Sequence, residues 1–398
     1  KIATINSNGV FKGILYLQLV GQGVKVTRMK SKWLILFMVF SLFLVACGGG
    51  SDEAAVEEVV EEEPAETLDA PATTAAPAEP EEDPMGICLV LDIGGLGDLS
   101  FNDLAYAGYE KAVADFGMKG TFLEPEGGGE NRGELLELCA EAGNDLIIGN
   151  GFLFDASMNE VAPNYPDLNF AITDGVAEPG NVRGMLFNHA EGSFLAGVAA
   201  ALKTKTNNVG FLGGVDFPLI HEFEQGFLAG VAAINPDIVV QIGYASVAPD
   251  FSGFNDTVKG KEIALAQYEA GADIIYHAAG GTGTGMFQAA KEVSESTGSK
   301  VWGIGVDFDQ YYQVGNALPE LQEYILSSMV KAVDVSIYNA AKQTMEGTFT
   351  GGANVDNLAT GGIYLSYSGG YIDDIKDQID SYKEKIMSGE IVPPSARP

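Results

Sequence analysis

The sequence predicts an α/β protein made of two doubly wound lobes with parallel sheets. Short apolar runs alternate with helical patterns through residues 85–398, which is typical of βαβ units. The two halves of that segment follow one plan of strand, glycine-containing loop, helix and strand. About eight strands result, and these fit two sheets better than one.

Each predicted strand is an apolar run that a helical pattern follows. In the first half the runs are 87–91, 120–123, 145–148 and 169–173, and in the second half they are 208–212, 238–242, 273–277 and 300–306. Gly117 and Gly143, for example, stand where glycine commonly ends a helix. Ligands of such folds bind at the carboxyl ends of the strands, so two facing lobes predict a cleft.

The N-terminal region lacks a globular pattern. Residues 1–28 precede Met29 and are interpreted as upstream translation, not part of the mature protein. Residues 29–46 combine two lysines with an apolar stretch that suits a signal peptide. That stretch is shorter than the roughly 20 residues that a membrane-spanning helix needs.

The segment "LVAC" (44–47) resembles the bacterial lipobox, in which a signal peptidase cuts before the cysteine, and Cys47 is therefore the predicted lipidated N-terminus. An ordinary signal peptide with a chance cysteine is the alternative. Residues 48–84 contain 13 acidic residues, no Lys or Arg and no aromatic residue. Such a segment cannot bury enough apolar surface to fold, so 47–84 is predicted to be a disordered acidic tether. A binding tail for a basic partner is the weaker alternative.

The net negative charge of the sequence argues against several classes of binding partner. The chain carries 55 acidic residues against 22 Lys and Arg, a net charge of −33. Such a surface repels nucleic acid and anionic lipid. Arg132, Arg183 and Arg397 are the only arginines after residue 84, which leaves little guanidinium for a phosphate site.

Two cysteines remain besides Cys47. Cys88 lies in an apolar run and Cys139 in a helical pattern. A disulfide between them is possible outside the cell, but two buried free thiols are the preferred interpretation. No Cys/His spacing suggests zinc.

Polar residues stand at the predicted strand ends. Asp92, Asp174 and Asp307 each follow an apolar strand, and "GGTGTG" (280–285) follows another. The glycine run resembles a dinucleotide-binding fingerprint only loosely, and a lone match is weak. No basic residue stands within it. We therefore expect no cofactor there.

Aromatic residues accompany two of these loops. Phe-Asn-Asp occurs at 101–103 and again at 254–256, each time before a predicted helix. One such ring would be a hydrophobic staple, but Phe101 and Phe254 on opposing loops favour an aromatic clamp around a flat ligand. Phe251 is a rival for the second ring.

Catalysis has no comparable signature. The three histidines fall in different elements, and no Ser or Cys stands in a G-x-S-x-G elbow. No pair of carboxylates stands out by its spacing as an acid/base pair. The sequence thus favours a binding protein over an enzyme.

Several segments together resemble one family. "LDIGGLGDLSFNDLAYAGYEKA", "VGFLGGVDFPLIHEFEQGFLAG", "HAAGGTGTGMFQAAKE", "GIGVDFDQ" and "SSMVKAVDVSIYNAAK" are similar to the basic membrane protein family, the purine-nucleoside-receptor-like lipoproteins. The resemblance implies a periplasmic-binding-protein type I fold with two lobes joined by three crossovers. Lobe 1 is then expected at 85–205 plus 328–350, and lobe 2 at 206–327 plus 351–398.

The resemblance also implies a binding site. Asp92, Phe101 and Asn102 fall on its "D…SFN" motif, and Phe254 falls on the second ring of the clamp. Gly281, Asp307 and Lys331 fall on positions that hold the ribose, and Asp174 matches a carboxylate that contacts the base. Asn102 can offer a donor and an acceptor to the base edge.

The expected function is that of a lipid-anchored, monomeric binding protein of an ABC importer. It would hold a purine nucleoside between its lobes on the extracytoplasmic face of the cell membrane and deliver it to a permease. One alternative is a sensing receptor of the same fold. A less favoured alternative is an exported enzyme that processes nucleosides.

Overall fold

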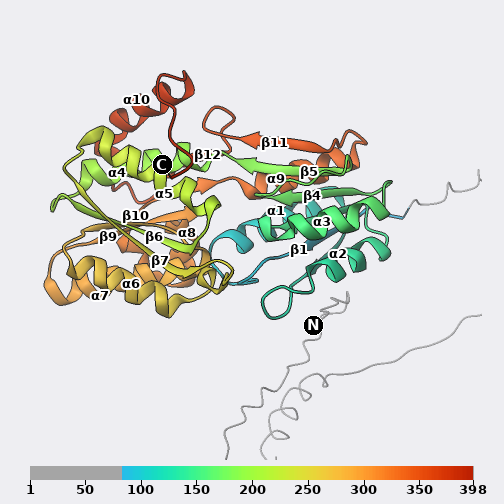
Figure 1. Ribbon diagram of the computed structural model, residues 1–398, viewed down its shortest axis with the longest axis horizontal. Coiled ribbons are helices and arrows are strands. Elements are labelled where there is room, and N and C mark those ends of the chain that lie inside the picture. The colour runs from blue at the N-terminus through green and yellow to red at the C-terminus, as the bar shows by residue number, and fades with distance from the viewer. Residues whose placement is uncertain (1–82, 398) are drawn as a thin grey trace, which may run out of the picture. The chain divides into compact units, whose positions relative to one another are not determined.

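The computed structural model describes residues 83–397. The upstream segment 1–28, the signal peptide 29–46, Cys47 and nearly all of the tether lie outside the described residues. Within 83–397, no helix has both the length and the apolar content needed to cross a membrane. These residues form two lobes, each with a six-stranded sheet between helices (Figure 1).

The first sheet has the strand order β11-β5-β4-β3-β1-β2, and all neighbouring strands are parallel. Its strands are β1 (Gly86–Val90), β2 (Lys119–Leu123), β3 (Leu146–Asn150), β4 (Asn169–Thr173), β5 (Val182–Phe187) and β11 (Gly352–Asp356). Its helices are α1 (Phe101–Phe116), α2 (Arg132–Glu141), α3 (Asp155–Val161) and α9 (Val333–Met345).

The second sheet repeats this plan in the order β12-β10-β9-β8-β6-β7. Its strands are β6 (Asn208–Asp216), β7 (Val239–Val247), β8 (Ile274–Ala278), β9 (Trp302–Asp307), β10 (Ile325–Lys331) and β12 (Ile363–Leu365). Its helices are α4 (His189–Lys203), α5 (Pro218–Ile234), α6 (Thr257–Glu269), α7 (Gly283–Thr297), α8 (Gln310–Ala317) and α10 (Lys376–Met387). Among the strands of residues 83–397, only β12 runs antiparallel, against β10, so the predicted class of two doubly wound lobes is confirmed.

The strands have apolar sequences because helices cover both faces of each sheet and bury the side chains on both sides. In β1, Ile87 and Leu89 join the core that contains α1 and α9. Cys88 and Val90 point the other way and join the core with α2 and α3. A strand buried on both faces has a nearly continuous apolar sequence, which is why β1 could be predicted from its sequence.

Three chain crossings join the lobes, as expected, but their positions differ from the predicted boundaries. They fall between β5 and α4, between β10 and α9, and between β11 and β12. Helix α4 therefore belongs to the second lobe, although the boundary at 205/206 assigned it to the first. Likewise β10 is a strand of the second sheet and β11 a strand of the first.

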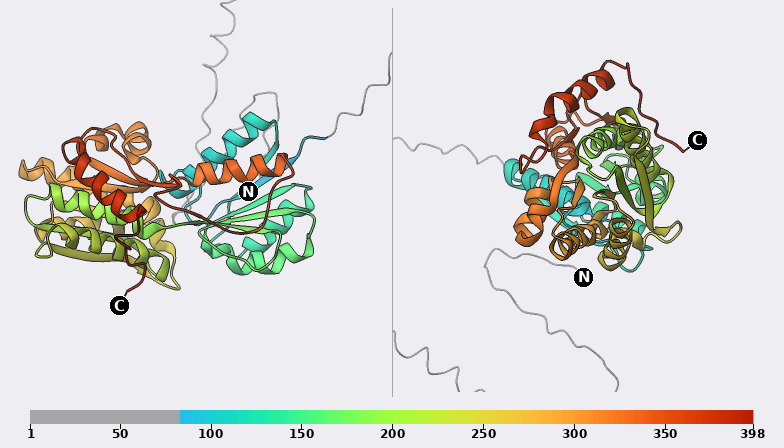
Figure 2. Two further views of the ribbon diagram at one scale, coloured as in Figure 1. Left: turned by 90° about the horizontal axis from the view of Figure 1, so that it is seen from above. Right: turned by 90° about the vertical axis from the view of Figure 1, so that its left-hand side faces the viewer.

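Close helix packing explains where α4 lies. Cβ atoms at Gly197 of α4 and Gly230 of α5 would collide with the carbonyl oxygens of Phe227 and Phe194, respectively. Glycine permits this approach of two helix backbones. Figure 2 shows α4 and α5 together in the second lobe, while α9 lies beside α1 in the first.

The prediction of two free thiols is wrong. Cys88 of β1 and Cys139 of α2 form a disulfide, with their Cα atoms 5.8 Å apart. Both residues belong to the core between the first sheet and α2. Packing of α2 onto β1 therefore brings together two cysteines that are 51 positions apart in the chain.

Candidate ligand-binding site

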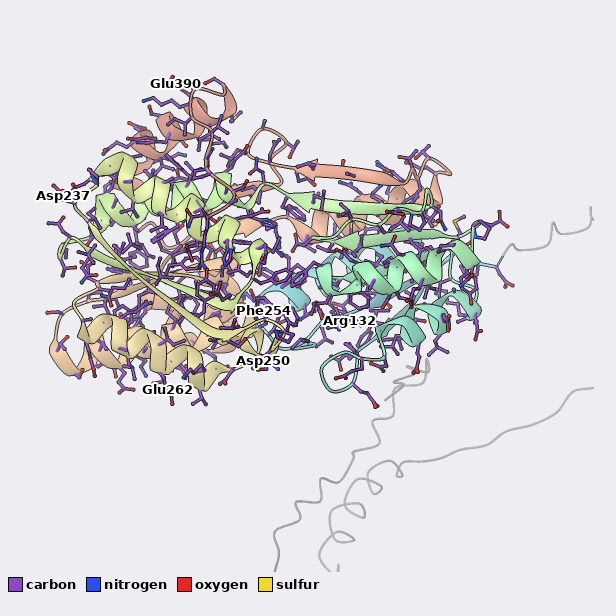
Figure 3. The ribbon with its side chains drawn as sticks, viewed as in Figure 1. Arg132, Asp237, Asp250, Phe254, Glu262 and Glu390 are labelled. Carbon is purple, nitrogen blue, oxygen red and sulfur yellow. A yellow bond between two sulfur atoms is a disulfide. The ribbon has the colours of Figure 1, made fainter. Side chains whose placement is uncertain are left out.

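A cavity lies between the lobes at the carboxyl ends of the strands. Both lobes contribute residues to its walls. Figure 3 places Phe254 of the second lobe and Arg132 of the first near the junction of the lobes. The lining residues are Asp92, Ile93, Asp98, Phe101, Asn102, Gly151, Phe152, Asp174, Leu219, Ile220, Phe223, Phe254, Ala278, Ala279, Gly280, Val306, Asp307 and Lys331.

Nearly all of the sequence-predicted site residues meet at this cavity. Its lining includes Asp92, Phe101, Asn102, Asp174, Phe254, Asp307 and Lys331. Gly281 is buried one residue behind the wall, where Gly280 takes its place. Sequence reasoning missed Asp98 and the apolar wall formed by Leu219, Ile220 and Phe223.

Asp98 organises the loop that carries Phe101. Its carboxylate accepts hydrogen bonds from the backbone N–H groups of Ser100 (2.9 Å), Asn102 (2.9 Å) and Asp103 (3.1 Å). A carboxylate at the start of a helix satisfies N–H groups that lack helical partners. The contacts fix the first turn of α1, and with it the position of Phe101.

The Asn102 amide is engaged by the protein itself. Its Oδ1 accepts from the Asp92 N–H (3.0 Å) and from Asn150 Nδ2 (3.2 Å). Its Nδ2 donates to the Ile93 carbonyl (3.2 Å) and to Asp98 Oδ2 (3.1 Å). With these four bonds Asn102 ties the ends of β1 and β3 to α1, which differs from the expected contact with a base edge.

An arginine from a distant part of the sequence holds Asp92. Arg132 Nη2 donates to Asp92 Oδ1 at 2.6 Å, and the Ile93 N–H donates to the same oxygen. Burial raises the pKa of Asp92, and Arg132 opposes that rise. No group within residues 83–397 bonds Asp92 Oδ2, which leaves this oxygen as an acceptor at the cavity wall.

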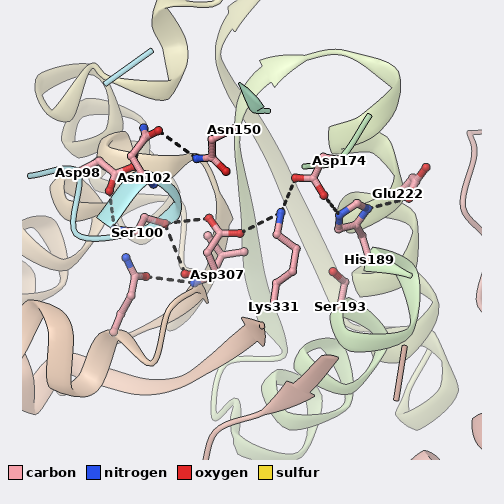
Figure 4. A network of polar contacts seen from close by, with 12 residues as sticks. Asp98, Ser100, Asn102, Asn150, Asp174, His189, Ser193, Glu222, Asp307 and Lys331 are labelled. Carbon is pink, nitrogen blue, oxygen red and sulfur yellow. Dashed lines mark hydrogen bonds and ion pairs between the residues drawn. The ribbon is translucent and has the colours of Figure 1, made fainter. Parts of the chain in front are cut away.

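A chain of charged groups crosses the floor of the cavity (Figure 4). Lys331 Nζ donates to Asp174 Oδ2 at 2.6 Å and lies 3.4 Å from Asp307 Oδ1. Asp307 Oδ2 accepts from Ser100 Oγ of the first lobe at 2.9 Å. Asp174 Oδ1 lies 3.2 Å from His189 Nε2. Because these partners come from both lobes, the chain of contacts links the lobes.

Burial and ion pairing together determine the pKa values of the charged groups on the cavity floor. Burial opposes ionisation of Asp174, but Lys331 and His189 outweigh it and lower the Asp174 pKa to about 2. Burial likewise disfavours the Lys331 charge, yet Asp174 and Asp307 raise the Lys331 pKa. Asp174 and Asp307 also share positive φ angles, 58° and 63°, a strained conformation that often marks functional sites.

Aromatic rings form two walls of the cavity. Phe101 comes from the first lobe and Phe254 from the second. Lys331 Nζ lies 4.6 Å from the centre of the Phe101 ring, close enough for a cation–π contact. A flat ligand between these rings could be covered from both lobes.

The rival ring, Phe251, does not line the cavity. It packs edge-on against Phe152 of the first lobe (5.8 Å between ring centres) and Phe217 of the second (5.6 Å). Phe152 and Phe217 stack at 4.9 Å. These three rings, which we call the interlobe aromatic cluster, connect the lobes beside the cavity that Phe152 lines.

The glycine run at 280–285 packs helices together. A Cβ at Gly283 would collide with the His277 ring, and a Cβ at Gly285 would collide with the Thr257 carbonyl of α6. Close packing of α7 therefore explains these glycines without a dinucleotide. Among residues 83–397, no three His, Cys, Asp or Glu side chains are grouped to hold a metal ion.

Two doubly wound lobes, three crossings and a ring-walled cavity at the strand ends define a solute-binding protein of the periplasmic-binding-protein type I fold. The sequence model of the family described as "ABC transporter substrate-binding protein PnrA-like" matches residues 87–396. The chain belongs to this family of ABC transporter substrate-binding proteins.

Individual proteins agree with this assignment. The "CD4+ T-cell-stimulating antigen" of Listeria innocua is 36% identical over 77% of this chain and 87% of its own length. The "ABC transporter nucleoside-binding protein BmpA" of Lactococcus lactis is 35% identical over 77% of this chain and 88% of its own. A crystal structure of an ABC transporter solute-binding protein from Aeropyrum pernix superposes with a TM-score of 0.68 at 28% identity, covering 78% of this chain and 94% of that one.

Proposed function

We propose that this protein binds a purine nucleoside between its lobes and delivers it to the permease of an ABC importer. It would act as a monomer at the extracytoplasmic face of the cell membrane, held there by lipidated Cys47 and its acidic tether. The observation that carries the proposal is the convergence of Phe101, Phe254 and three strand-end carboxylates on one cavity. The Lactococcus relative named as nucleoside-binding supports it.

Each part of a nucleoside has a suitable partner in the cavity. The flat base would stack between Phe101 and Phe254, with its N–H groups donating to Asp92 Oδ2. The ribose hydroxyls would reach Asp307 and Lys331, which accept and donate hydrogen bonds respectively. The backbone at Gly280 offers no side chain that would keep the sugar away.

The charge of the site favours a nucleoside over a nucleotide. Lys331 is the only cationic side chain among the lining residues, and it is already paired with Asp174 and Asp307. A phosphate would meet carboxylates with no free cation to offset its charge.

The proposal also implies that the ligand leaves unchanged. Asp92, Asp174 and Asp307 each bond a cation or a hydroxyl of the protein. Lys331 and His189 hold Asp174 ionised, so that it orients a solute, and an acid that donates a proton needs the opposite environment.

Calorimetry and thermal unfolding with inosine, guanosine, adenosine, their 5′-monophosphates, free bases and ribose test this function. We expect the nucleosides to bind and to raise the unfolding temperature by mass action, while monophosphates bind far more weakly. Monophosphate binding as tight as nucleoside binding, or a response to ribose alone, would refute the proposal. Chromatography of the recovered inosine separates binding from hydrolysis, because an enzyme would release free base.

A further inference from the structure

His189 lies outside every motif considered above, yet it sits at the centre of the interlobe contacts. It is the first residue of α4, directly after the crossing from β5, and its side chain is 3% exposed. Its ring contacts carboxylates on both sides. Nε2 lies 3.2 Å from Asp174 Oδ1 of the first lobe, and Nδ1 lies 2.9 Å from Glu222 Oε2 of α5.

This geometry defines the protonation of the ring. A neutral imidazole has one N–H donor and one acceptor nitrogen, whereas an imidazolium donates from both nitrogens. An ionised carboxylate can only accept. With a neutral ring, one of the two contacts would therefore set a nitrogen lone pair against a carboxylate oxygen. Only the cation satisfies both contacts.

We propose that His189 is a positioning residue of the ligand site, which carries a proton in the closed protein and holds Asp174 against Lys331. Its role concerns the carboxylates of the cavity, whatever solute fills it. Only the affinity experiment below rests on the proposed nucleoside function.

Some groups around His189 favour its protonation and others oppose it. Asp174 and Glu222 favour the imidazolium. Phe223 stacks on the ring with 4.4 Å between centres and also favours a cation. Lys331 and the N-terminal dipole of α4 oppose it, as does burial. Burial is the largest single influence, but the hydrogen bonds to the two carboxylates outweigh it, so that the His189 pKa is raised.

Protonation of His189 is coupled to closure of the cleft because the contacts of His189 connect the two lobes. Asp174 contacts His189 and Lys331 across the two lobes in this structure, which has the cleft closed around these groups, and opening of the cleft would separate them. His189 would then keep only the contact with Glu222, so closure would strengthen proton binding. By linkage, closure then weakens once the pH is high enough for the open form to lose its proton.

Nuclear magnetic resonance of ¹⁵N-labelled histidine side chains tests the charge without any ligand. Residues 83–397 contain three histidines, and His189→Gln and His221→Gln assign the signals. We expect both His189 nitrogens to be protonated at pH 7. The buried ring of His277, with its pKa lowered to about 4, supplies a neutral reference in the same spectrum. A neutral His189 at pH 7 would overturn the proposal, even if His189→Gln fails to fold.

A pH series of inosine affinity supplies the functional test. We expect the wild-type dissociation constant to rise with pH by up to about tenfold per unit, and the profile of His189→Gln to be flat over the same range. His221→Gln, outside the cavity, should retain the wild-type slope. Equal slopes in wild type and His189→Gln would overturn the coupling. If no nucleoside binds at all, the proposed function fails while the resonance experiment still decides the state of His189.

Discussion

Lys331 and Asp174 belong to different lobes and meet at 2.6 Å beneath the cavity. Lys331 ends β10 of the second sheet, and Asp174 follows β4 of the first. Their side chains are only 3% and 5% exposed. The same lysine approaches Asp307 and the Phe101 ring, so one cation organises both the carboxylates and an aromatic wall.

Replacing Lys331 should lower the free energy of unfolding strongly. Lys331→Met would leave Asp174 and Asp307 buried without their shared cation, and loss of one partner from a buried ion pair costs about 3–5 kcal/mol. Urea unfolding measures the loss. Lys342→Met is the matched control, because Lys342 is half exposed and pairs loosely with Glu346 at 3.9 Å. Equal stability of the two variants would contradict the role given to Lys331.

The aromatic wall makes a separate prediction for ligand binding. Phe101→Ala should weaken inosine binding by about 1–3 kcal/mol, the usual contribution of a ring stacked on a base. Phe116→Ala lies at the far end of the same helix, against Tyr338, and should leave the affinity unchanged. Calorimetry on both variants distinguishes the two outcomes. An unaltered affinity in Phe101→Ala would rule out the clamp.

Much of this arrangement could be predicted because it follows from local patterns. Strand β1 is apolar along its whole length and β4 is apolar at its three central positions, and a polar residue at or just after the end of a parallel strand lies at the ligand edge of the sheet. These two rules suffice to find Asp92, Asp174 and Asp307. The missed strands lack the pattern, because β5 contains Arg183, β10 contains paired serines and β11 is polar.

Other parts of the site could not be predicted from local sequence. Arg132 reaches Asp92 across 40 residues, and His189 reaches Asp174 across 15. Such pairings depend on how helices pack, and the sequence around each residue carries no sign of them. The assignment of α4 to a lobe failed for the same reason, since its glycine contacts with α5 are tertiary.

The interlobe aromatic cluster should control how long a ligand stays bound. Phe251→Ala removes the ring that packs against both Phe152 and Phe217, and each aromatic pair contributes about 0.5–1.5 kcal/mol. Because the contact between Phe251 and Phe152 connects the lobes, we expect ligand dissociation to accelerate by roughly 2- to 10-fold. Stopped-flow kinetics measures this rate. A change confined to association would argue against a role in holding the cleft closed.

The low pKa of Asp174 predicts part of the response to acid. Its pKa falls from 3.8 to about 2 on folding, so its ionised form stabilises the protein above pH 3.8. That contribution, about 2 kcal/mol, is lost as the pH falls from 3.8 towards 2. Unfolding free energies at pH 5 and pH 2.5 should therefore differ more in wild type than in Asp174→Asn. Parallel pH profiles would show that Asp174 contributes nothing to the acid response.

The disulfide between Cys88 and Cys139 should stabilise the first lobe without affecting the ligand. It joins β1 to α2 within the core between the first sheet and helices α2 and α3. Neither cysteine lines the cavity. A bond that closes a loop of this length stabilises a fold by about 2–4 kcal/mol. The double variant Cys88→Ala/Cys139→Ala should lose that stability and keep its affinity for inosine. Peptide mass spectrometry after alkylation of the denatured, unreduced protein checks the bond directly, because labelled Cys88 and Cys139 would show that both thiols are free.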